Sequence, residues 1–488
     1  MPLKEKSAIE NLEADLVILG SGGGMVAAVT AAEEGVKNII VIEKQGVLGG
    51  NTRLAGGIFA CESPVQKRAN IVAEKDEFFK KAMRWFHWDI VDPMVLRAFI
   101  DQSGDTIRWL EENGVAFAEK FAQSEQPRGN HRPKGRGLEL MAALIKKAET
   151  MGVKILLRTQ GQKILQDGSG KVSGVVAATR DGKKFEIKAK AVIIATGGFS
   201  GNTELLGKHC PDYSDQMHKG KWPYHTGDGL LMAAEAGAAI ADIIPIFHIG
   251  PVPASGPWGG LANGVKAPFT VWVNKRGKRY IDESGYEVWE NGNAIRLQPD
   301  METYTLFDDA IRKTLEDQKL LTTLGWGKAP WENEIDQPSE QDGMVAELVK
   351  KGLVRQFNGW KDVAEWIGAE PSELKATINE YNVACDQGRD PIFAKAPKYL
   401  RPLRKAPYYA VRCYVHGGET MGGVRVNARM ETLDTNTGVI PGLYTASVLA
   451  HGWSGQTYPG HELRGSAFGF ALNSGRITGK SAAVFITG

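Results

Sequence analysis

The sequence predicts an α/β fold in which a Rossmann-like dinucleotide-binding domain is assembled from two segments, 1–245 and 410–488, around an α+β capping domain inserted at 246–409. Three observations lead to this prediction. A strand, a glycine-rich turn, a helix and a second strand follow one another near the start of the chain. Two further apolar strands bordered by glycines lie far downstream. The stretch between those two strands is first rich in proline, glycine and tryptophan and then charged and helical.

The first unit carries the features of a dinucleotide-binding turn. An apolar strand runs into the glycines Gly20, Gly22, Gly23 and Gly24, and an alanine-rich helix follows. Glycines in this place allow a tight turn and let the backbone approach a pyrophosphate at the start of the helix. Glu43 ends the second strand, where a carboxylate accepts hydrogen bonds from ribose hydroxyls.

The remaining strands of the predicted sheet come in two places. A hairpin is expected at 172–187 around an Asp-Gly turn, and it leads into an apolar strand that ends in Gly197 and Gly198. Another apolar strand spans 438–446. Because these strands are dispersed along the chain, we expect one nucleotide-binding sheet built from distant segments.

The insert is expected to act as a lid or cap rather than as a second catalytic core. Its helical patterns lie around 311–319 and 374–386. The run of lysine and arginine at 275–279 is interpreted as a solvated turn, as charge runs usually are.

The composition is that of a globular chain, and it does not favour a highly charged binding partner. Of the 488 residues, 42% are hydrophobic and 24% are charged, which is enough apolar material for two or three cores. The net charge of +2 gives no basic field for nucleic acid. Since the chain contains no apolar run of about 18 residues and no secretory signal pattern, we expect a cytoplasmic protein without a membrane span.

Short motifs recur in a fixed order along nearly the whole chain. Besides the first turn, they are Gly49-Gly50-Asn51-Thr52 with Ala55-Gly56-Gly57, Ala195-Thr196-Gly197-Gly198-Phe199, Thr226-Gly227-Asp228-Gly229, the stretch from Val273 to Glu283, Thr420-Met421-Gly422-Gly423-Val424, the stretch from Ile440 to Tyr444, Arg464, and the stretch from Gly475 to Gly479. In this order they resemble the family of FAD-dependent enzymes that contains soluble fumarate reductase, succinate dehydrogenase flavoprotein, L-aspartate oxidase, urocanate reductase and the 3-ketosteroid dehydrogenases. The resemblance implies an FAD-binding domain of two segments and an inserted capping domain, with the substrate held between them against the flavin.

No metal or haem centre is expected, because the four cysteines lie too far apart for an iron–sulfur or haem site. The resemblance also implies that FAD is bound non-covalently. Membrane-bound relatives link FAD to a histidine near the first glycine run, whereas Asn51 occupies the comparable place here. Relatives commonly have Ala-Gly-Glu after the last strand of the sheet, where this chain has Ala446-Ser447-Val448. The implied cofactor-binding residues are Gly20, Gly22, Gly23, Gly24, Glu43, Lys44, Gly50, Asn51, Thr52, Gly56, Gly57, Thr196, Gly197, Gly198, Thr226, Asp228, Gly422 and Ser447.

Five residues are candidates for catalysis. Arg464 matches the arginine with which the fumarate-reducing members grip a substrate carboxylate, and a salt bridge to a neighbouring carboxylate is its alternative role. His248 falls where the family often has a substrate-facing histidine, and its alternative is a packed core residue. Tyr458, in a Tyr-Pro-Gly sequence similar to that of the 3-ketosteroid dehydrogenases, is the first choice for acid or electrophile, with Tyr286 and His461 next. The alternative role of Tyr458 is simple packing in a Pro-Gly turn.

Three departures from the family argue against the usual dicarboxylate chemistry. Soluble fumarate reductases carry a catalytic arginine four residues after the glutamate equivalent to Glu283, where this chain has Glu287. The Thr-Glu pair of their proton relay is missing from the stretch 260–264, and Glu419 replaces the histidine that precedes Thr-Met-Gly-Gly.

Together the residues predict an FAD-dependent oxidoreductase that reduces or forms a carbon–carbon double bond next to a carbonyl or carboxylate. Hydride passes between a substrate carbon and flavin N5, a tyrosine or histidine moves the proton, and Arg464 orients the activating group. The direction, the small-molecule substrate and the electron donor or acceptor stay open, and a flavin oxidase that uses dioxygen is one alternative. A flavin-binding electron-transfer subunit or scaffold is the alternative from another class. A disulfide reductase is not expected, because the four cysteines include no redox pair.

Overall fold

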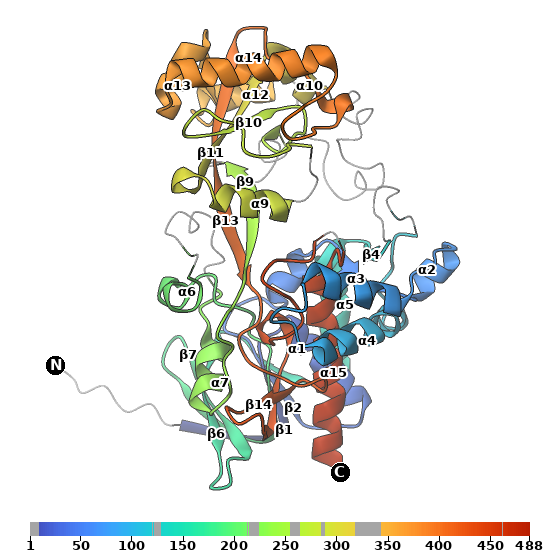
Figure 1. Ribbon diagram of the computed structural model, residues 1–488. Coiled ribbons are helices and arrows are strands. Elements are labelled where there is room, and N and C mark those ends of the chain that lie inside the picture. Colours follow the sequence, from blue (N-terminus) through green and yellow to red (C-terminus); the bar gives the residue numbers. More distant parts are fainter. Residues whose placement is uncertain are drawn as a thin grey trace, which may run out of the picture. The chain divides into compact units, whose positions relative to one another are not determined.

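The computed structural model describes residues 9–119, 121, 128–211, 213, 224–253, 264–284, 288–317, 343–460 and 462–488 (Figure 1). The described residues form two compact units. The first unit contains the described parts of 9–213 together with 224–247 and 419–488, and the second contains those of 248–418. None of the helices described is long and apolar enough to cross a membrane.

The first unit is built on a mainly parallel sheet, which confirms the predicted α/β class. The strand order is β14-β15-β8-β1-β2-β5, and all neighbours except β14 and β15 are parallel. Leu19 pairs with both Ile42 and Ile194, so the central strands end level with one another. The turns that follow them therefore lie along one edge of the sheet, where nucleotides bind in this kind of fold. The strands are β1 (Ile9–Leu19), β2 (Ile39–Ile42), β5 (Lys154–Leu156), β8 (Lys184–Ile194), β14 (Glu431–Leu433) and β15 (Val439–Thr445), with the hairpin β6 (Thr159–Gln166) and β7 (Val172–Thr179) attached to β8.

Strands β1 and β8 begin earlier than the apolar runs predict. The sequence places the first strand at 15–19, but β1 starts at Ile9. Its extension pairs Ile9 with Lys184 and continues to the pair Ala14 with Ala189. This half of β1 is largely exposed, and in this half of β8 exposed lysines alternate with buried residues such as Phe185 and Ile187, so neither segment forms a continuous apolar run.

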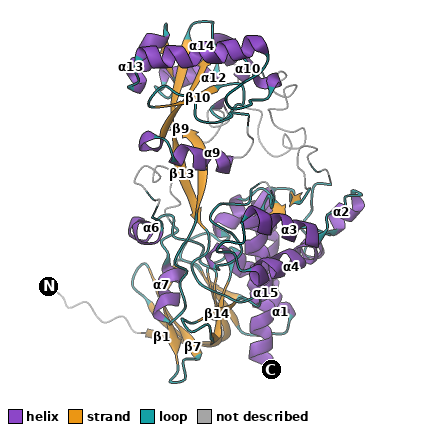
Figure 2. Cartoon of the chain, in the orientation of Figure 1, coloured by secondary structure: helices purple, strands orange, loops and turns teal. Residues whose placement is uncertain are grey.

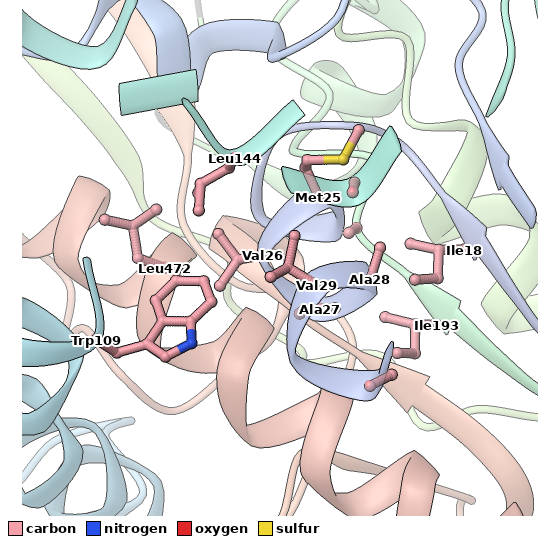
Figure 3. Close-up of a cluster of buried hydrophobic side chains, with 14 of the residues drawn as sticks. Ile18, Met25, Val26, Ala27, Ala28, Val29, Trp109, Leu144, Ile193 and Leu472 are labelled. Carbon is pink, nitrogen blue, oxygen red and sulfur yellow. The ribbon is translucent and has the colours of Figure 1, made fainter. Parts of the chain in front are cut away.

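Helices and short elements cover this sheet. They are α1 (Gly23–Glu33), α2 (Pro64–Arg68), α3 (Lys75–Trp85), α4 (Pro93–Glu112), α5 (Arg136–Thr150), α6 (Thr203–His209), α7 (Asp228–Glu235), α15 (Ser466–Thr487), the 3-10 segments η1 (Gly50–Leu54) and η5 (Ser447–Leu449), and the strand pair β3 (Ile58–Phe59) and β4 (Asn130–His131). Helix α1 is buried from its first residue to Ala31, because it contacts the sheet, α5 and α15. Figure 3 shows Val26 and Val29 of α1 among Ile193 of the sheet and Leu472 of α15.

Helices α1 and α15 pack through bare glycine backbone. A Cβ at Gly475 would lie 2.4 Å from the carbonyl oxygen of Gly23, and a Cβ at Gly479 would lie 2.7 Å from that of Ala27. A Cβ at Gly23 would in turn lie 2.5 Å from the carbonyl oxygen of Ala471. Because these contacts advance in the same direction along both helices, α1 and α15 run parallel. Their N-termini therefore point to the same side of the unit.

The second unit is an antiparallel sheet with helices, the α+β architecture that the sequence predicts for the insert. Its strand order is β10-β11-β13-β12, and β9 also pairs with β13. Figure 2 shows the helices α13 and α14 beside one another at one end of these strands. The predicted helices at 311–319 and 374–386 correspond to α10 and α14. The elements are β9 (Ile246–Pro253), β10 (Val271–Asn274), α9 (Val288–Arg296), η3 (Pro299–Met301), β11 (Glu302–Asp308), α10 (Asp309–Glu316), α12 (Met344–Lys350), β12 (Arg355–Phe357), α13 (Trp360–Ile367), α14 (Pro371–Gln387), η4 (Pro397–Tyr399) and β13 (Tyr408–Thr420).

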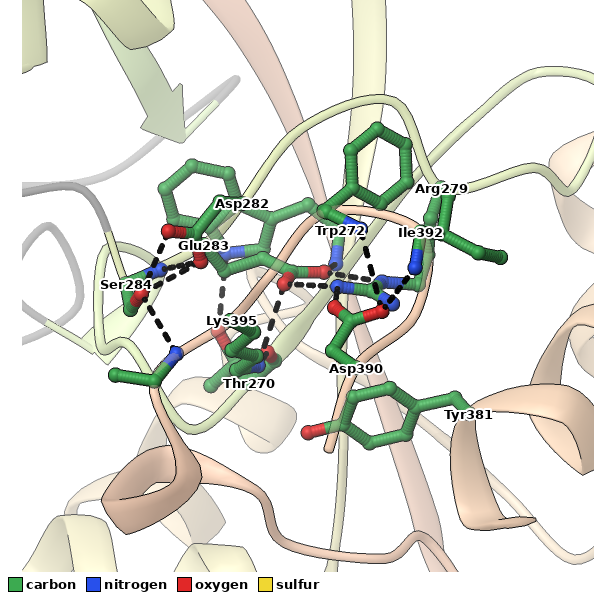
Figure 4. Close-up of polar contacts among 12 residues, drawn as sticks. Thr270, Trp272, Arg279, Asp282, Glu283, Ser284, Tyr381, Asp390, Ile392 and Lys395 are labelled. Atoms are coloured by element: carbon green, nitrogen blue, oxygen red, sulfur yellow. Dashed lines mark hydrogen bonds and ion pairs between the residues drawn. The ribbon is translucent and has the colours of Figure 1, made fainter. Parts of the chain in front are cut away.

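A buried ionic cluster ties the second unit together (Figure 4). Arg279 donates from Nε and Nη2 to the carboxylate of Glu283, at 2.9 and 2.7 Å, and from Nη2 to Asp390 Oδ2 at 2.8 Å. Lys395 Nζ donates to the carbonyl oxygen of Thr270 at 2.7 Å and lies 3.3 Å from Glu283. Burial by itself would raise the pKa of Glu283, but Lys395 and Arg279 outweigh it and hold that pKa below its ordinary value.

The interpretation of 275–279 as a solvated turn is therefore wrong for Arg279. The side chains of Lys275 and Lys278 are 35% and 50% exposed, whereas that of Arg279 is 5% exposed. One partner, Glu283, lies only four residues further along, whereas the other, Asp390, lies 111 residues further along the chain and leaves no local sign.

The close approach of α1 and α15 makes a prediction about stability. We expect Gly475→Ala to lower the free energy of unfolding by about 1–3 kcal/mol, because the added methyl group meets backbone that cannot move independently. Urea unfolding followed by tryptophan fluorescence measures the change. Gly207→Ala is the matched control, since Gly207 is also helical and has open space around its missing Cβ. An equal stability of both variants would contradict the packing argument.

His131 makes a second prediction, on pH dependence. The ring is 1% exposed, with Nε2 2.6 Å from Ser63 Oγ and Nδ1 3.0 Å from the carbonyl oxygen of Gly129. Burial lowers its pKa from 6.5 to about 4. Since the unfolded chain then binds the proton more readily, the stability is fully present above pH 6.5 and is lost as the pH falls toward 4. We expect the protonation of this histidine to lower the free energy of unfolding by about 2 kcal/mol between pH 7 and pH 5. In His131→Gln, the difference in the free energy of unfolding between these two pH values should be smaller by that amount. An unchanged difference would contradict the assignment.

Candidate cofactor and catalytic site

The turn after β1 presents bare backbone at the start of α1. Gly20 has a φ of +95°, and a Cβ there would lie 2.4 Å from the carbonyl oxygen of Ala195. A Cβ at Gly22 would lie 2.7 Å from Thr52 Oγ1. Gly22 caps α1 without a side-chain hydrogen bond, so no capping side chain occupies the first amide groups of the helix. Such amides, together with the helix dipole, suit a pyrophosphate.

Glu43 directly follows β2 beside this turn and is 7% exposed. Its carboxylate accepts hydrogen bonds from Ser21 Oγ at 2.6 Å and from the amide of Gln45 at 2.8 Å. Ser21 Oγ accepts in turn from the amide of Gly49 at 2.9 Å. Glu43 therefore joins the dinucleotide turn to the segment 49–52, the next part of the predicted cofactor site.

A small cavity of about 50 Å³ opens where β1 and β2 end. Its lining includes Glu43, Lys44, Thr196 and Asp228. Lys44 Nζ donates to Thr226 Oγ1 at 2.6 Å and to Asp228 Oδ2 at 2.9 Å. Thr196 Oγ1 is buried here and has no hydrogen-bond partner in the described part of the chain. A bare glycine turn and an unused buried hydroxyl fit the adenosine diphosphate half of FAD.

Glycines of the other predicted cofactor segments lie close to neighbouring parts of the first unit. A Cβ at Gly57 would lie 2.1 Å from Asn130 Oδ1. Gly422 has a φ of +93°, and a Cβ there would lie 2.9 Å from His451 Nδ1. Gly56 and Gly50 belong to the same glycine-rich stretch as Gly57. All of the predicted cofactor-binding residues lie in the first unit.

Ser447 takes an unusual backbone conformation. Its φ is +67°, in the left-handed region that glycine favours. The amide of Ser447 donates to Ser474 Oγ on α15 at 2.8 Å. This bond fixes the segment after β15 against α15, and the side chain of Val448 supplies no carboxylate there.

A polar cluster at Asn51 escaped the sequence analysis. Asn51 Nδ2 donates to Glu419 Oε2 at 3.3 Å, and the same carboxylate forms an ion pair with His225 Nδ1. The side chains of His225 and Glu419 are 12% and 14% exposed. The only sequence signals are the position of His225 directly before the Thr-Gly-Asp-Gly motif and the position of Glu419 directly before Thr-Met-Gly-Gly.

Tyr458 lies in the first unit and is 7% exposed. Its ring packs edge to face against Phe247, with 4.4 Å between the centroids. The phenol oxygen accepts a hydrogen bond from the amide of Ala467 at 3.3 Å. Since Ala467 is the second residue of α15, the phenol sits at the N-terminus of that helix. Arg464 is half-buried and immediately precedes Gly465, which caps α15.

Of the other three catalytic candidates, the structure describes one. His248 lies on β9 in the second unit, where its Nδ1 is 2.9 Å from Asn293 Oδ1 and the residue is 8% exposed. Tyr286 and His461 lie outside the described residues.

Cys61 is not suited to redox chemistry. Burial raises the pKa of its thiol to about 11, and Sγ lies 3.4 Å from Ser103 Oγ. A thiol of this kind is protonated at neutral pH and is a poor nucleophile.

Known proteins share this fold and these motifs. The family model described as FAD binding domain matches residues 15–461. Fumarate reductase (cytochrome) from Shewanella frigidimarina is 30% identical over 479 residues, which cover 96% of this chain and 77% of that protein. Vinyl phenol reductase from Lactiplantibacillus plantarum is 29% identical, and the match covers 96% of each chain. The open conformation of a flavocytochrome c3 fumarate reductase is a similar solved structure, with a TM-score of 0.76, 26% identity, and coverage of 98% of this chain and 79% of that chain.

The unused hydroxyl of Thr196 predicts a contact with the cofactor. We expect Thr196→Val to raise the Kd for FAD about fivefold, because one hydrogen bond contributes about 1 kcal/mol. Titration of the apoprotein with FAD, followed by flavin fluorescence, gives the Kd. Thr30→Val is the matched control, since Thr30 Oγ1 is also buried without a partner among the described residues but lies within α1. An unchanged Kd in Thr196→Val, or an equal loss in the control, would contradict the assignment.

Proposed function

This chain belongs to the FAD binding domain family, and on that premise we propose that it reduces a carbon–carbon double bond conjugated to a carbonyl group or an aromatic ring in a small molecule. The FAD cofactor and flavin-dependent chemistry on CH–CH groups, both predicted from the sequence, are confirmed by the family match and by the reductases among its relatives. The direction of reduction, the class of substrate and the catalytic residues are our proposal.

The position of Tyr458 carries the proposal. When FAD is bound, it supplies the two-electron chemistry by exchanging a hydride between N5 and a substrate carbon. Reduction of a double bond also needs a proton at the second carbon, and the Tyr458 phenol holds one at Oη. The amide of Ala467 already donates to this oxygen, and the N-terminus of α15 favours negative charge. Both stabilise the phenolate that remains after the proton has been given up.

Two further observations support a substrate that is not a dicarboxylate. Phe247 and Tyr458 form an aromatic pair in the FAD-binding unit, suited to contact with a ring or a flat conjugated system. Glu419 adds a carboxylate beside Asn51, where a second negative charge on the substrate would be unfavourable. Arg464, next to the start of α15, is proposed to orient the activating oxygen of the substrate. One relative, which the match covers over 96% of its length, is named for a vinyl phenol.

The experiment is an anaerobic one. The flavin is reduced chemically, and its reoxidation is followed by stopped flow with vinyl phenols, cinnamates, enones and fumarate. We expect fast reoxidation by a member of the first three classes and slow reoxidation by fumarate. Fumarate as the fastest oxidant would instead support a dicarboxylate reductase, the candidate that the Shewanella relative favours.

Tyr458→Phe makes the prediction specific to one oxygen atom. We expect the variant to keep FAD and to lose turnover by about 10²–10⁴-fold, the usual contribution of a positioned acid. Tyr224→Phe is the control, because Tyr224 is 58% exposed and should tolerate the change. Turnover retained in Tyr458→Phe would contradict its role as the acid. If Tyr458→Phe slows only the reoxidation of the reduced flavin by the alkene and leaves the other steps unchanged, the protein is an enzyme rather than an electron-transfer scaffold.

A further inference from the structure

A cavity of about 760 Å³ lies in the FAD-binding unit, beside the hairpin of β14 and β15. Its wall is formed by the segments 90–93, 239–243, 425–426 and 433–437 together with His451, all within this unit. The wall contains none of the predicted cofactor-binding residues and none of the catalytic candidates. The volume lies in the range of about 300–1,000 Å³ that is usual for small-molecule sites. We call this space the hairpin cavity.

Much of the wall of the hairpin cavity is apolar. Ile90, Ile240, Ile243 and Leu433 line it, and Ile243 is 45% exposed. They come from the loop before α4, from the stretch between α7 and β9, and from β14. A ligand with an apolar body would remove these side chains from water, which is favourable.

Arg425 is the cation among the described residues that line the cavity. Burial and the nearby Arg425 lower the pKa of His451, so the imidazole is uncharged at neutral pH. Arg425 forms an ion pair with Asp242, in which Nη2 and Oδ2 are 3.9 Å apart. This distance is too long for a hydrogen bond. The guanidinium, which is bidentate in its preferred contacts, is therefore available to a carboxylate.

Asp242 is the carboxylate of the cavity that is not engaged by backbone amides. Asp92 Oδ1 accepts from the first amides of α4, and Asp434 Oδ1 accepts from the amides of Asn436 and Gly438. The Asp242 side chain is 95% exposed, and its partner among the described residues is Arg425. Because these two charges lie side by side without a hydrogen bond, a head group with opposite charges on neighbouring atoms can bond both.

We propose that the hairpin cavity binds an α-amino acid with a large apolar side chain. The carboxylate of the amino acid accepts from Arg425, its ammonium group donates to Asp242, and its side chain lies against the apolar wall. Two short charge-assisted hydrogen bonds then replace one long ion pair. A ligand with an anionic group alone would leave Asp242 unpaired, and one with a cationic group alone would leave Arg425 unpaired. The inference does not depend on the substrate or on Tyr458.

Calorimetric titration of the holoenzyme with L-phenylalanine tests the proposal. We expect saturable binding of one molecule per chain. The compounds 3-phenylpropionate, phenethylamine and glycine lack the ammonium group, the carboxylate and the apolar side chain, respectively. We expect the Kd of each to be at least about tenfold higher. Equal binding of any of the three, or no saturable binding of L-phenylalanine, would overturn the proposal.

Two variants place the binding in the hairpin cavity. Arg425→Gln and Asp242→Asn each remove one charge from an exposed side chain, so the fold should be kept. We expect each to raise the Kd for L-phenylalanine about tenfold. Arg429→Gln is the control, because Arg429 lies beside the same hairpin, is 71% exposed and pairs with Glu431 outside the cavity wall. An unchanged Kd in either variant, or an equal rise in the control, would overturn the proposal, because the amino acid would then bind elsewhere.

Discussion

The close packing of α1 on α15 is the contact on which the cofactor site depends. Three glycines, Gly23, Gly475 and Gly479, let the two backbones meet without side chains between them. The helices are parallel, so both present the positive ends of their dipoles on the same side. One end follows the dinucleotide turn, and the other carries the amide that bonds Tyr458. A cofactor that carries a pyrophosphate and, some distance along the molecule, a redox ring matches two such helix ends.

The same packing explains why distant segments can form one site. Ser447 is tied to Ser474 of α15, and Glu43 is tied through Ser21 to the segment that begins at Gly49. Each of these bonds joins a loop to an element of the α1–α15 pair or to the sheet beneath it. The loops then contribute single groups: a carboxylate at the sheet edge, a phenol at a helix start and a histidine beside Gly197. The scaffold holds the geometry, and the chemistry resides in the loops.

Local sequence predicts the sheet and the cofactor turn well, because apolar strands, glycines and a terminal carboxylate occur within about one supersecondary unit. Contacts between distant positions leave no such pattern. His225 and Glu419 are 194 positions apart, and neither motif beside them requires a charged partner. Arg279 belongs to a run that looks solvated, yet Asp390 and Glu283 bury it. The exposed half of β1 was missed for the opposite reason, since backbone pairing with β8 rather than burial makes it a strand.

A structure with FAD bound tests the central claim most directly. If the parallel packing of α1 and α15 organises the site, the pyrophosphate will lie within about 3.5 Å of the first amides of α1, and the flavin ring will contact the first turn of α15. A pyrophosphate bound away from the segment 22–25, or a flavin ring that does not touch the segment 464–467, would contradict it.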